Sequence, residues 1–129
     1  MFYDNCDNDK PLSLIAGPCV FESLSHAVET AEEIREICIS VGQLFDRDIN
    51  FIYKTSFDKA NRSSASSFRS AGFDEAYYGM EAVRGRGIEV LTDVHEPWQC
   101  EQVQADIIQI PAFLCRQTDL LRAAAESGK

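Results

Sequence analysis

Two periodicities alternate along the chain. Short apolar runs bounded by glycine, proline or polar residues are typical of strands, and longer segments with apolar residues every three to four positions are typical of helices. The predicted strands are Leu12–Ala16, Ile49–Tyr53, Ile88–Thr92 and Asp106–Ile110. The predicted helices are Leu24–Val41, Phe73–Arg84, Trp98–Val103 and Thr118–Glu126. Strands and helices therefore follow one another in strict alternation.

The boundaries of these elements carry their own signals. Gly17-Pro18 ends the first strand, which we expect to be buried, and Gly42 is the predicted end of the first helix. Pro111 closes the fourth strand. The apolar face of the first helix comprises Leu24, Ala27, Val28, Ala31, Ile34, Cys38 and Val41. The inward residues of the second helix are Phe73, Ala76, Tyr77, Met80 and Val83.

Four βα units in this order require a parallel sheet with right-handed crossovers. A small doubly wound sheet and part of a (β/α)8 barrel both fit. A complete barrel takes about 250 residues, and this chain has 129. We therefore predict an α/β fold, a partial (β/α)8 TIM barrel of about four βα units. Residues 1–11 are the expected lead-in and residues 12–129 one half-barrel domain.

Composition narrows the class of protein. With 45% apolar and 26% charged residues, the chain can form one modest core. The polar, acidic start and the lack of a long apolar run predict neither a signal peptide nor a membrane span, and hence a cytoplasmic protein. A net charge of −9 argues against nucleic acid or an anionic membrane as partner. Five widely spaced cysteines without a CxxC pair do not indicate a disulfide framework.

The segment Lys54–Ser64, directly after the second strand, concentrates groups that bind anions. It holds Lys54, Lys59, Arg62 and Asn61 with four hydroxyls and one carboxylate. Lysine, arginine and hydroxyl groups together match phosphate oxygens. The alternative is a solvated polar loop. The position at the carboxyl end of a strand, where α/β proteins bind ligands, favours an anion site.

Polar residues also follow the other three strands, and in a parallel barrel all four strand ends share one face. They are Cys19, then Asp93 and His95, then Gln109 and the segment to Arg116. Convergence at this face is the main prediction from the residues alone.

Each of these residues also has an alternative without function. Cys19 is a metal ligand, a nucleophile or inert packing. Asp93 and His95, two apart on an extended strand end, share one side, where they could hold a water, a metal or a proton, or merely satisfy each other. Arg116 and Gln117 bind an anion or form the solvated first turn of a helix.

Four segments in this order resemble a known family. They are LIAGPCVFES at 14–23, KTSFDKANRSS at 54–64, LTDVHEP at 91–97 and QIPAFLCRQTDLL at 109–121. Together they are similar to the 3-deoxy-D-manno-octulosonate 8-phosphate synthases from about Leu12 to Lys129. The second and fourth segments separate this family from the related heptulosonate synthases.

The resemblance implies a homotetrameric (β/α)8 barrel that condenses phosphoenolpyruvate with arabinose 5-phosphate and releases phosphate. The product is used in the inner core of lipopolysaccharide. Both substrates are small phosphorylated anions, in keeping with the cationic segment.

The resemblance also implies roles for individual residues. Lys54 and Lys59 match lysines at the phosphoenolpyruvate carboxylate, with Gln109 nearby. The residues that match the sugar-phosphate contacts are Asn61, Arg62 and Ser63, and Arg116 and Gln117 match groups that reach a neighbouring subunit's site. Asp93 and His95 match residues near the reacting carbons and their water, Phe113 matches an apolar wall, and Cys19 matches a ligand of a divalent metal cation.

Three departures from the family accompany these matches. Ser70-Ala71 stands where the family has Gly-Pro, which alters a turn beside the substrate segment, and the connection from Val41 to Asn50 is longer than usual. The family's other metal ligands and its main phosphate ligands for phosphoenolpyruvate correspond to positions after Lys129. We therefore expect 129 residues alone to be inactive, because half a barrel exposes sheet edges. The alternatives are an inactive fragment that keeps a sugar-phosphate site, and heptulosonate synthase chemistry.

Overall fold

The computed structural model describes residues 10–129, so most of the predicted lead-in, residues 1–9, lies outside the described part. Four strands form one parallel sheet in the order β1-β2-β3-β4. They are β1 (Leu12–Ala16), β2 (Ile49–Lys54), β3 (Glu89–Asp93) and β4 (Ile107–Gln109). The helices are α1 (Leu24–Phe45), α2 (Phe73–Arg84), α3 (Gln99–Gln102) and α4 (Thr118–Glu126), with a short 3-10 helix η2 (Ala112–Leu114). The predicted alternation of strands and helices is confirmed.

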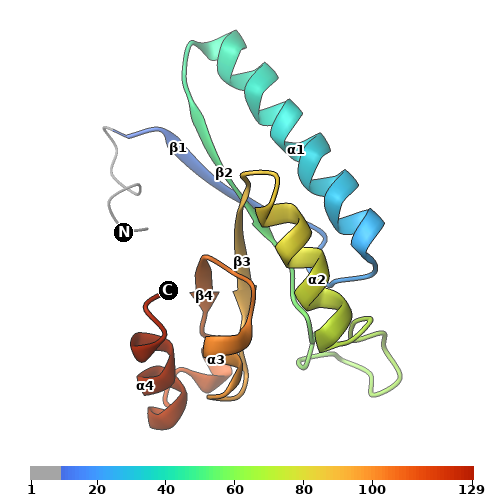
Figure 1. Ribbon diagram of the computed structural model, residues 1–129, viewed down its shortest axis with the longest axis vertical. Coiled ribbons are helices and arrows are strands. Elements are labelled where there is room, and N and C mark those ends of the chain that lie inside the picture. Colours follow the sequence, from blue (N-terminus) through green and yellow to red (C-terminus); the bar gives the residue numbers. More distant parts are fainter. Residues whose placement is uncertain (1–9) are drawn as a thin grey trace.

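A single core lies between the sheet and its helices (Figure 1). All four helices contribute to it, for example Ala31 from α1, Met80 from α2, Cys100 from α3 and Leu120 from α4. Side chains alternate along a strand. Phe51 and Tyr53 of β2 therefore face this core, whereas Ile52 between them faces the opposite side of the sheet. Sequential strand order with the helices packed into one core is the arrangement of a partial (β/α)8 barrel, and a doubly wound sheet would reverse its order.

The ends of several elements differ from the prediction. The helix α1 continues past Gly42 to Phe45, and Asp46 ends it in the left-handed conformation with φ 52°. Aspartate tolerates this conformation because its short polar side chain can bond locally. The glycine serves a different purpose, since a Cβ at Gly42 would lie 2.6 Å from the carbonyl oxygen of Arg47. The strand β4 and the helix α3 are each shorter than predicted, and β2 and β3 each reach one residue further.

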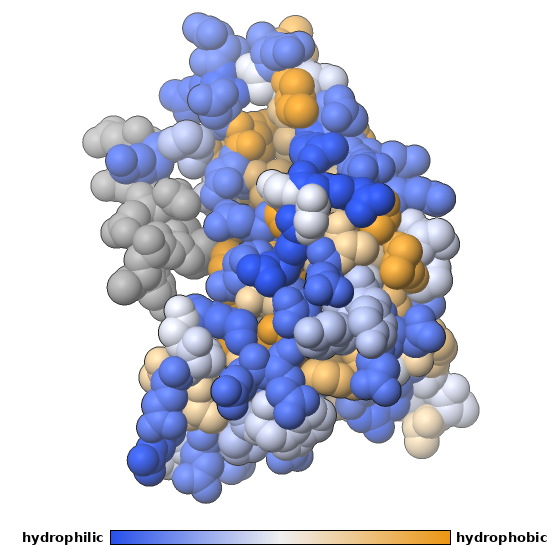
Figure 2. Space-filling model, viewed as in Figure 1, coloured by the Kyte–Doolittle hydropathy of each residue, from blue (hydrophilic) through white to orange (hydrophobic). Residues whose placement is uncertain are grey.

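The strand β1 was predicted to be buried, and this prediction is wrong. Leu12 is 66% exposed and Ile15 is 44% exposed. The physical reason is that, among the described residues, β1 pairs only with β2 and no second strand covers its other side. Ile37, Leu44 and Phe45 on α1 are exposed as well. Figure 2 shows hydrophobic surface among polar atoms in the upper part of the view, where α1 lies. In residues 10–129, no helix combines the length and the apolar composition that crossing a membrane would require.

The contact between α2 and the segment after β1 gives a first prediction. A Cβ at Gly79 would lie 2.1 Å from the Phe21 ring, which is fully buried and has nowhere to move. We expect Gly79→Ala to lower the free energy of unfolding by about 1–3 kcal/mol through overpacking. Urea denaturation followed by circular dichroism measures this change.

Gly85→Ala is the matched control, since Gly85 has helical φ and ψ and a Cβ there would lie 3.4 Å from its nearest neighbour, the Glu81 carbonyl oxygen. It should leave the urea midpoint unchanged or raise it slightly, because alanine restricts the unfolded chain. Equal losses in the two variants would contradict the packing argument.

Candidate functional site

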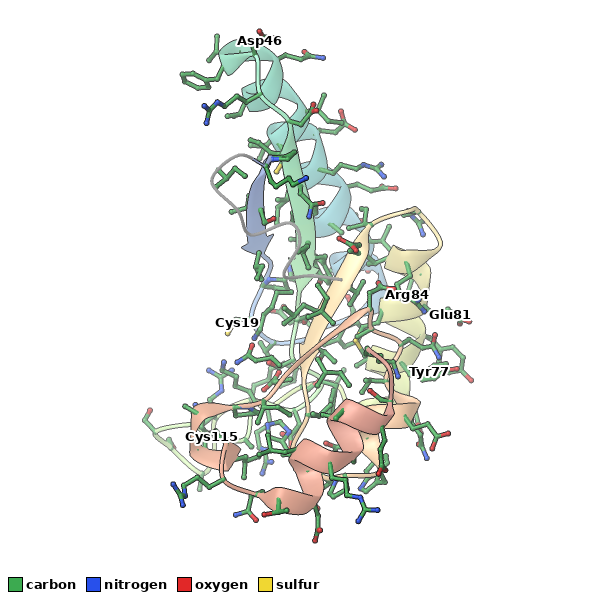
Figure 3. All side chains as sticks on the ribbon, turned by 90° about the vertical axis from the view of Figure 1, so that its left-hand side faces the viewer. Cys19, Asp46, Tyr77, Glu81, Arg84 and Cys115 are labelled. Carbon is green, nitrogen blue, oxygen red and sulfur yellow. The ribbon has the colours of Figure 1, made fainter. Side chains whose placement is uncertain are left out.

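The strand register brings the four polar strand ends to one edge of the sheet. Lys54 pairs with Leu91, two residues before Asp93, and Asp93 pairs with Gln109. The segment after β1 lies against the end of β2, where a Cβ at Gly17 would be 2.0 Å from the Lys54 carbonyl oxygen. Only glycine permits this approach. Cys19 lies two residues further along the chain, in the segment that follows β1 (Figure 3). The segments that follow β1, β2, β3 and β4 therefore meet at the carboxyl edge.

A buried polar chain connects β2 to β3 at this edge. Lys54 Nζ donates to Ser56 Oγ over 3.1 Å, and Ser56 Oγ donates in turn to Asp93 Oδ1. His95 Nε2 lies 3.4 Å from Asp93 Oδ2. Burial of the Asp93 carboxyl raises its pKa, but the hydrogen bonds from His95 and Ser56 and the charge of Lys54 outweigh it. The pKa of Asp93 therefore lies below its usual value, and the site holds a carboxylate near neutral pH.

Aromatic rings and one amide fix His95. Phe57 meets its ring edge-on at a centroid distance of 6.0 Å, and Phe113 stacks on it at 6.4 Å. Gln99 Oε1 accepts the backbone N–H of His95 over 2.7 Å. Nδ1 of His95 is buried and has no hydrogen-bond partner within residues 10–129. Phe113, predicted as an apolar wall, is half-exposed and lies beside the polar chain.

Cys19 and Lys59 form a second polar contact at the same edge. Lys59 Nζ donates to Cys19 Sγ over 2.9 Å, and Cys19 has left-handed backbone geometry with φ 69°. The hydrogen bond from Lys59 is the main cause that lowers the pKa of the Cys19 thiol. Burial opposes this shift, and the charges of Lys54 and Lys59 add to it, whereas Asp93 works against it. The thiol is exposed, so its sulfur faces solvent near two lysines.

The segment with Asn61, Arg62 and Ser63 forms an exposed loop that is tied at its base. These three side chains make no hydrogen bond or ion pair within the described part of the chain. Below them, Arg69 forms a two-pronged ion pair with Asp58 at 2.7 and 2.6 Å. The side chains of the loop that can bind an anion are therefore exposed to solvent, while the ion pair between Arg69 and Asp58 holds the two ends of the loop together.

Ser70, one of the departures from the family, contributes to that base. Its hydroxyl donates to the Phe21 carbonyl over 3.2 Å, and Gly72 N donates to the hydroxyl over 3.3 Å. Ala71 N donates to the same Phe21 carbonyl. These bonds hold the turn to the segment after β1, so the Ser-Ala pair makes contacts of its own here.

The remaining predicted residues are less closely associated. Gln109 is at the edge, next to Asp93, but its side chain is exposed. Arg116 and Gln117 are exposed between η2 and α4, and in the described residues no hydrogen bond joins them to the other predicted site residues. Sequence reasoning missed Ser56 and Phe57. The period of two along a strand could have found Ser56, because it places this residue on the same side as Lys54.

The predicted metal site is not complete within the described residues. No three His, Cys, Asp or Glu side chains in residues 10–129 lie close enough together to hold an ion. Cys19 has the lowered thiol pKa that a ligand needs, but the Lys59 ammonium occupies one side of its sulfur. Within residues 10–129, Cys19 therefore belongs to no complete set of metal ligands.

The contact between Lys59 and Cys19 gives a second prediction. Lys59→Met removes the hydrogen bond that lowers the thiol pKa, so the pKa of Cys19 should rise toward its usual value. The pH midpoint of Cys19 alkylation by iodoacetamide should then move upward. Mass spectrometry of the Cys19 peptide separates this site from the other cysteines.

Lys129→Met is the control, since Lys129 donates to the Cys100 and Glu101 carbonyls and not to Cys19. Its alkylation midpoint at Cys19 should match that of the unsubstituted chain. A midpoint unmoved by Lys59→Met would show that the hydrogen bond does not govern this thiol.

Comparison with known proteins finds relatives over nearly the whole chain. Residues 5–129 match the DAHP synthetase I family. The chain is 52% identical to a 2-dehydro-3-deoxyphosphooctonate aldolase of Methylobacillus flagellatus, over 94% of this chain and 42% of that protein. It is 53% identical to the proteins of that name from Rhodopseudomonas palustris and Fusobacterium nucleatum, over 95% and 93% of this chain. The chain spans 42% of the length of each of these relatives. With a family match over nearly its whole length, the chain belongs to the DAHP synthetase I family.

Proposed function

We propose that this chain carries the carboxyl-edge residues of a synthase that joins phosphoenolpyruvate to arabinose 5-phosphate. The products are 3-deoxy-D-manno-octulosonate 8-phosphate, an inner-core sugar precursor of lipopolysaccharide, and inorganic phosphate. The observation that carries the proposal is the meeting of Lys54, Lys59, Asp93 and His95 at one sheet edge. The name of the curated relatives supports the same chemistry.

Local charge supports the binding of two anions by an acidic protein. The net charge is −9, so attraction must come from cations focused at the site. Lys54 and Lys59 are assigned to the carboxylate of phosphoenolpyruvate, with Gln109 beside them. Asn61, Arg62 and Ser63, on the exposed loop, are assigned to arabinose 5-phosphate. Within residues 10–129 their side chains make no hydrogen bond or ion pair, which leaves these polar groups available to a ligand.

The reaction needs one carbon–carbon bond and one attack by water. C3 of the enol attacks the sugar aldehyde carbon, whose oxygen takes up a proton to become a hydroxyl. Water attacks C2 and loses a proton, and the C2–O bond to phosphate then breaks. The C2 hydroxyl gives up its proton, so C2 becomes a ketone carbon and inorganic phosphate departs. Holding both anions in place supplies proximity and offsets their mutual repulsion.

Asp93 and His95 are assigned to the proton transfers at the reacting carbons. Nε2 of His95 is directed at the Asp93 carboxylate, so the pair can hold and pass on a proton. The Phe113 ring on His95 provides an apolar wall that keeps bulk water away.

Two broader features belong to the same proposal. Arg116 and Gln117 are assigned to the sugar-phosphate site of a neighbouring subunit, in a homotetramer formed by the whole protein. Their exposure, without contacts to the other site residues, leaves them free to reach another subunit. A cytoplasmic location is supported by free thiols at Cys19, Cys38, Cys100 and Cys115.

A divalent cation held in part by Cys19 is a further element of the proposal. The lowered thiol pKa supports a thiolate at this position, and the other ligands would have to come from outside residues 10–129. When bound, such a cation would polarise a carbonyl oxygen or a water.

A chimera tests the substrates. Residues 5–129 replace the matching segment of the Methylobacillus flagellatus relative, which restores the full length of that protein. We expect the chimera to release phosphate from phosphoenolpyruvate with arabinose 5-phosphate at least tenfold faster than with erythrose 4-phosphate.

Arg62→Ala in the chimera should raise KM for arabinose 5-phosphate by about 10–100-fold, the loss expected for a charged hydrogen bond of about 1.5–3 kcal/mol. Arg122→Ala, which removes an exposed arginine paired with Glu126 on α4, is the control and should leave KM unchanged. If a folded chimera prefers erythrose 4-phosphate, the proposed function is wrong and heptulosonate synthase chemistry is supported instead. A folded chimera with no turnover of either sugar would favour a fragment that keeps only a sugar-phosphate site.

Cobalt binding tests the metal proposal without measuring activity. Co²⁺ added to the metal-free chimera should give a near-ultraviolet band from sulfur-to-cobalt charge transfer, and Cys19→Ser should remove it. Cys115→Ser removes another exposed thiol and should keep the band. A band that survives Cys19→Ser would show that another residue supplies the sulfur.

A further inference from the structure

The Ser56 hydroxyl stands between the two charged groups of the buried polar chain. Ser56 is fully buried, and a hydroxyl has one proton to donate. It donates this proton to Asp93 Oδ1 and accepts a hydrogen bond from Lys54 Nζ. The direction of both bonds is therefore fixed by a charged lysine on one side and a carboxylate on the other.

The hydroxyl also keeps the two charges apart. No direct ion pair joins Lys54 to Asp93 among residues 10–129, although their side chains point to the same side of neighbouring strands. Opposite charges in a buried setting attract strongly. With the serine between them, Lys54 and Asp93 each use one hydrogen bond on the Ser56 hydroxyl. The other donors of Lys54 and the other oxygen of Asp93 can then bind elsewhere. For Lys54 these are two further N–H groups, and for Asp93 it is Oδ2, which faces His95.

The backbone of Ser56 adds a third connection. Its carbonyl oxygen accepts the N–H of Phe21 over 2.9 Å, two residues after Cys19. One residue therefore joins the segment after β1, the end of β2 and the end of β3. The Ser56 side chain connects β2 to β3, and its main chain connects β2 to the segment after β1. A substitution of the side chain therefore tests only the connection between β2 and β3.

We propose that Ser56 is a positioning residue that holds Lys54 and Asp93 apart and aims each at its own partner. It directs Lys54 toward the anionic substrate and Asp93 Oδ2 toward His95. This inference rests on the proposed function, because it explains how the substrate lysine and the proton-transfer pair stay separate. Without the hydroxyl, Lys54 and Asp93 close into a direct pair, and both are withdrawn from their partners.

A matched set of variants separates this role from a loss of packing. Ser56→Ala removes the hydroxyl, and Ser56→Thr restores it. Thr55→Val is the control, because Thr55 is equally buried and one residue away but faces the other side of the sheet. Its hydroxyl lies near the Tyr53 hydroxyl and makes no hydrogen bond to Lys54, Asp93 or His95.

The first measurement uses the 129-residue chain and requires no catalysis. The chain has two histidines, so long-range ¹H–¹⁵N spectra resolve the tautomer of His95 with His26 as internal reference. We expect His95 to carry its proton on Nε2, facing Asp93, in the unsubstituted chain, Thr55→Val and Ser56→Thr. In Ser56→Ala we expect a mixture of the two tautomers. An unchanged tautomer in Ser56→Ala would overturn the proposal.

The second measurement uses the chimera and separates KM from kcat. Ser56→Ala should raise KM for phosphoenolpyruvate and lower kcat about 10–100-fold, the loss expected when reacting groups are misplaced, with KM for arabinose 5-phosphate unchanged. Ser56→Thr should recover most of kcat. Unchanged constants in Ser56→Ala, or an equal loss in Thr55→Val, would overturn the proposal. If the unsubstituted chimera does not turn over its substrates, the proposed function fails. The tautomer of His95 then tests by itself whether Ser56 positions Asp93.

Discussion

Parallel pairing of the four strands is the constraint on which the rest of this structure depends. In a parallel sheet every strand runs in the same direction, so each connection must return across the helix layer before the next strand begins. All four carboxyl ends then lie on one edge, and residues far apart in sequence become neighbours there. The contact of Lys59 with Cys19 and that of Ser56 with Asp93 join positions 40 and 37 residues apart.

Burial decides which of these neighbours interact strongly. Asp93 and Ser56 have almost no contact with solvent, so each must find its hydrogen bonds within the protein. The carboxylate obtains them from Ser56 and His95, and the charge of Lys54 compensates for lost solvation. By contrast, Arg62 and its neighbours are exposed, where an unpaired charge costs little. The edge therefore combines a rigid buried chain on β2 and β3 with a loop whose side chains are open to solvent.

The position of β1 as the first strand of the sheet explains why several apolar residues are exposed. An inner strand of a barrel is paired on both edges, whereas within residues 10–129 the strand β1 is paired with β2 alone. Leu12 and Ile15 are apolar in a pattern that suits a buried strand, yet they are exposed. The same applies to Ile37 and Leu44 on α1. Their composition fits a larger assembly of strands and helices, and relatives more than twice as long are consistent with it.

The sequence by itself determined the α/β class, the alternation of elements and the bounds of β1, α2 and α4. These follow from local periodicity and from the glycine, proline and polar residues that separate the elements. It also placed Lys54, Asp93 and His95 at strand ends. It could not decide the exposure of β1, since burial depends on what lies beside a strand and not on its own pattern. Nor could it single out Ser56, one hydroxyl among several in its segment. Only the tertiary structure, by bringing β2 against β3, gave that hydroxyl a lysine on one side and a carboxylate on the other.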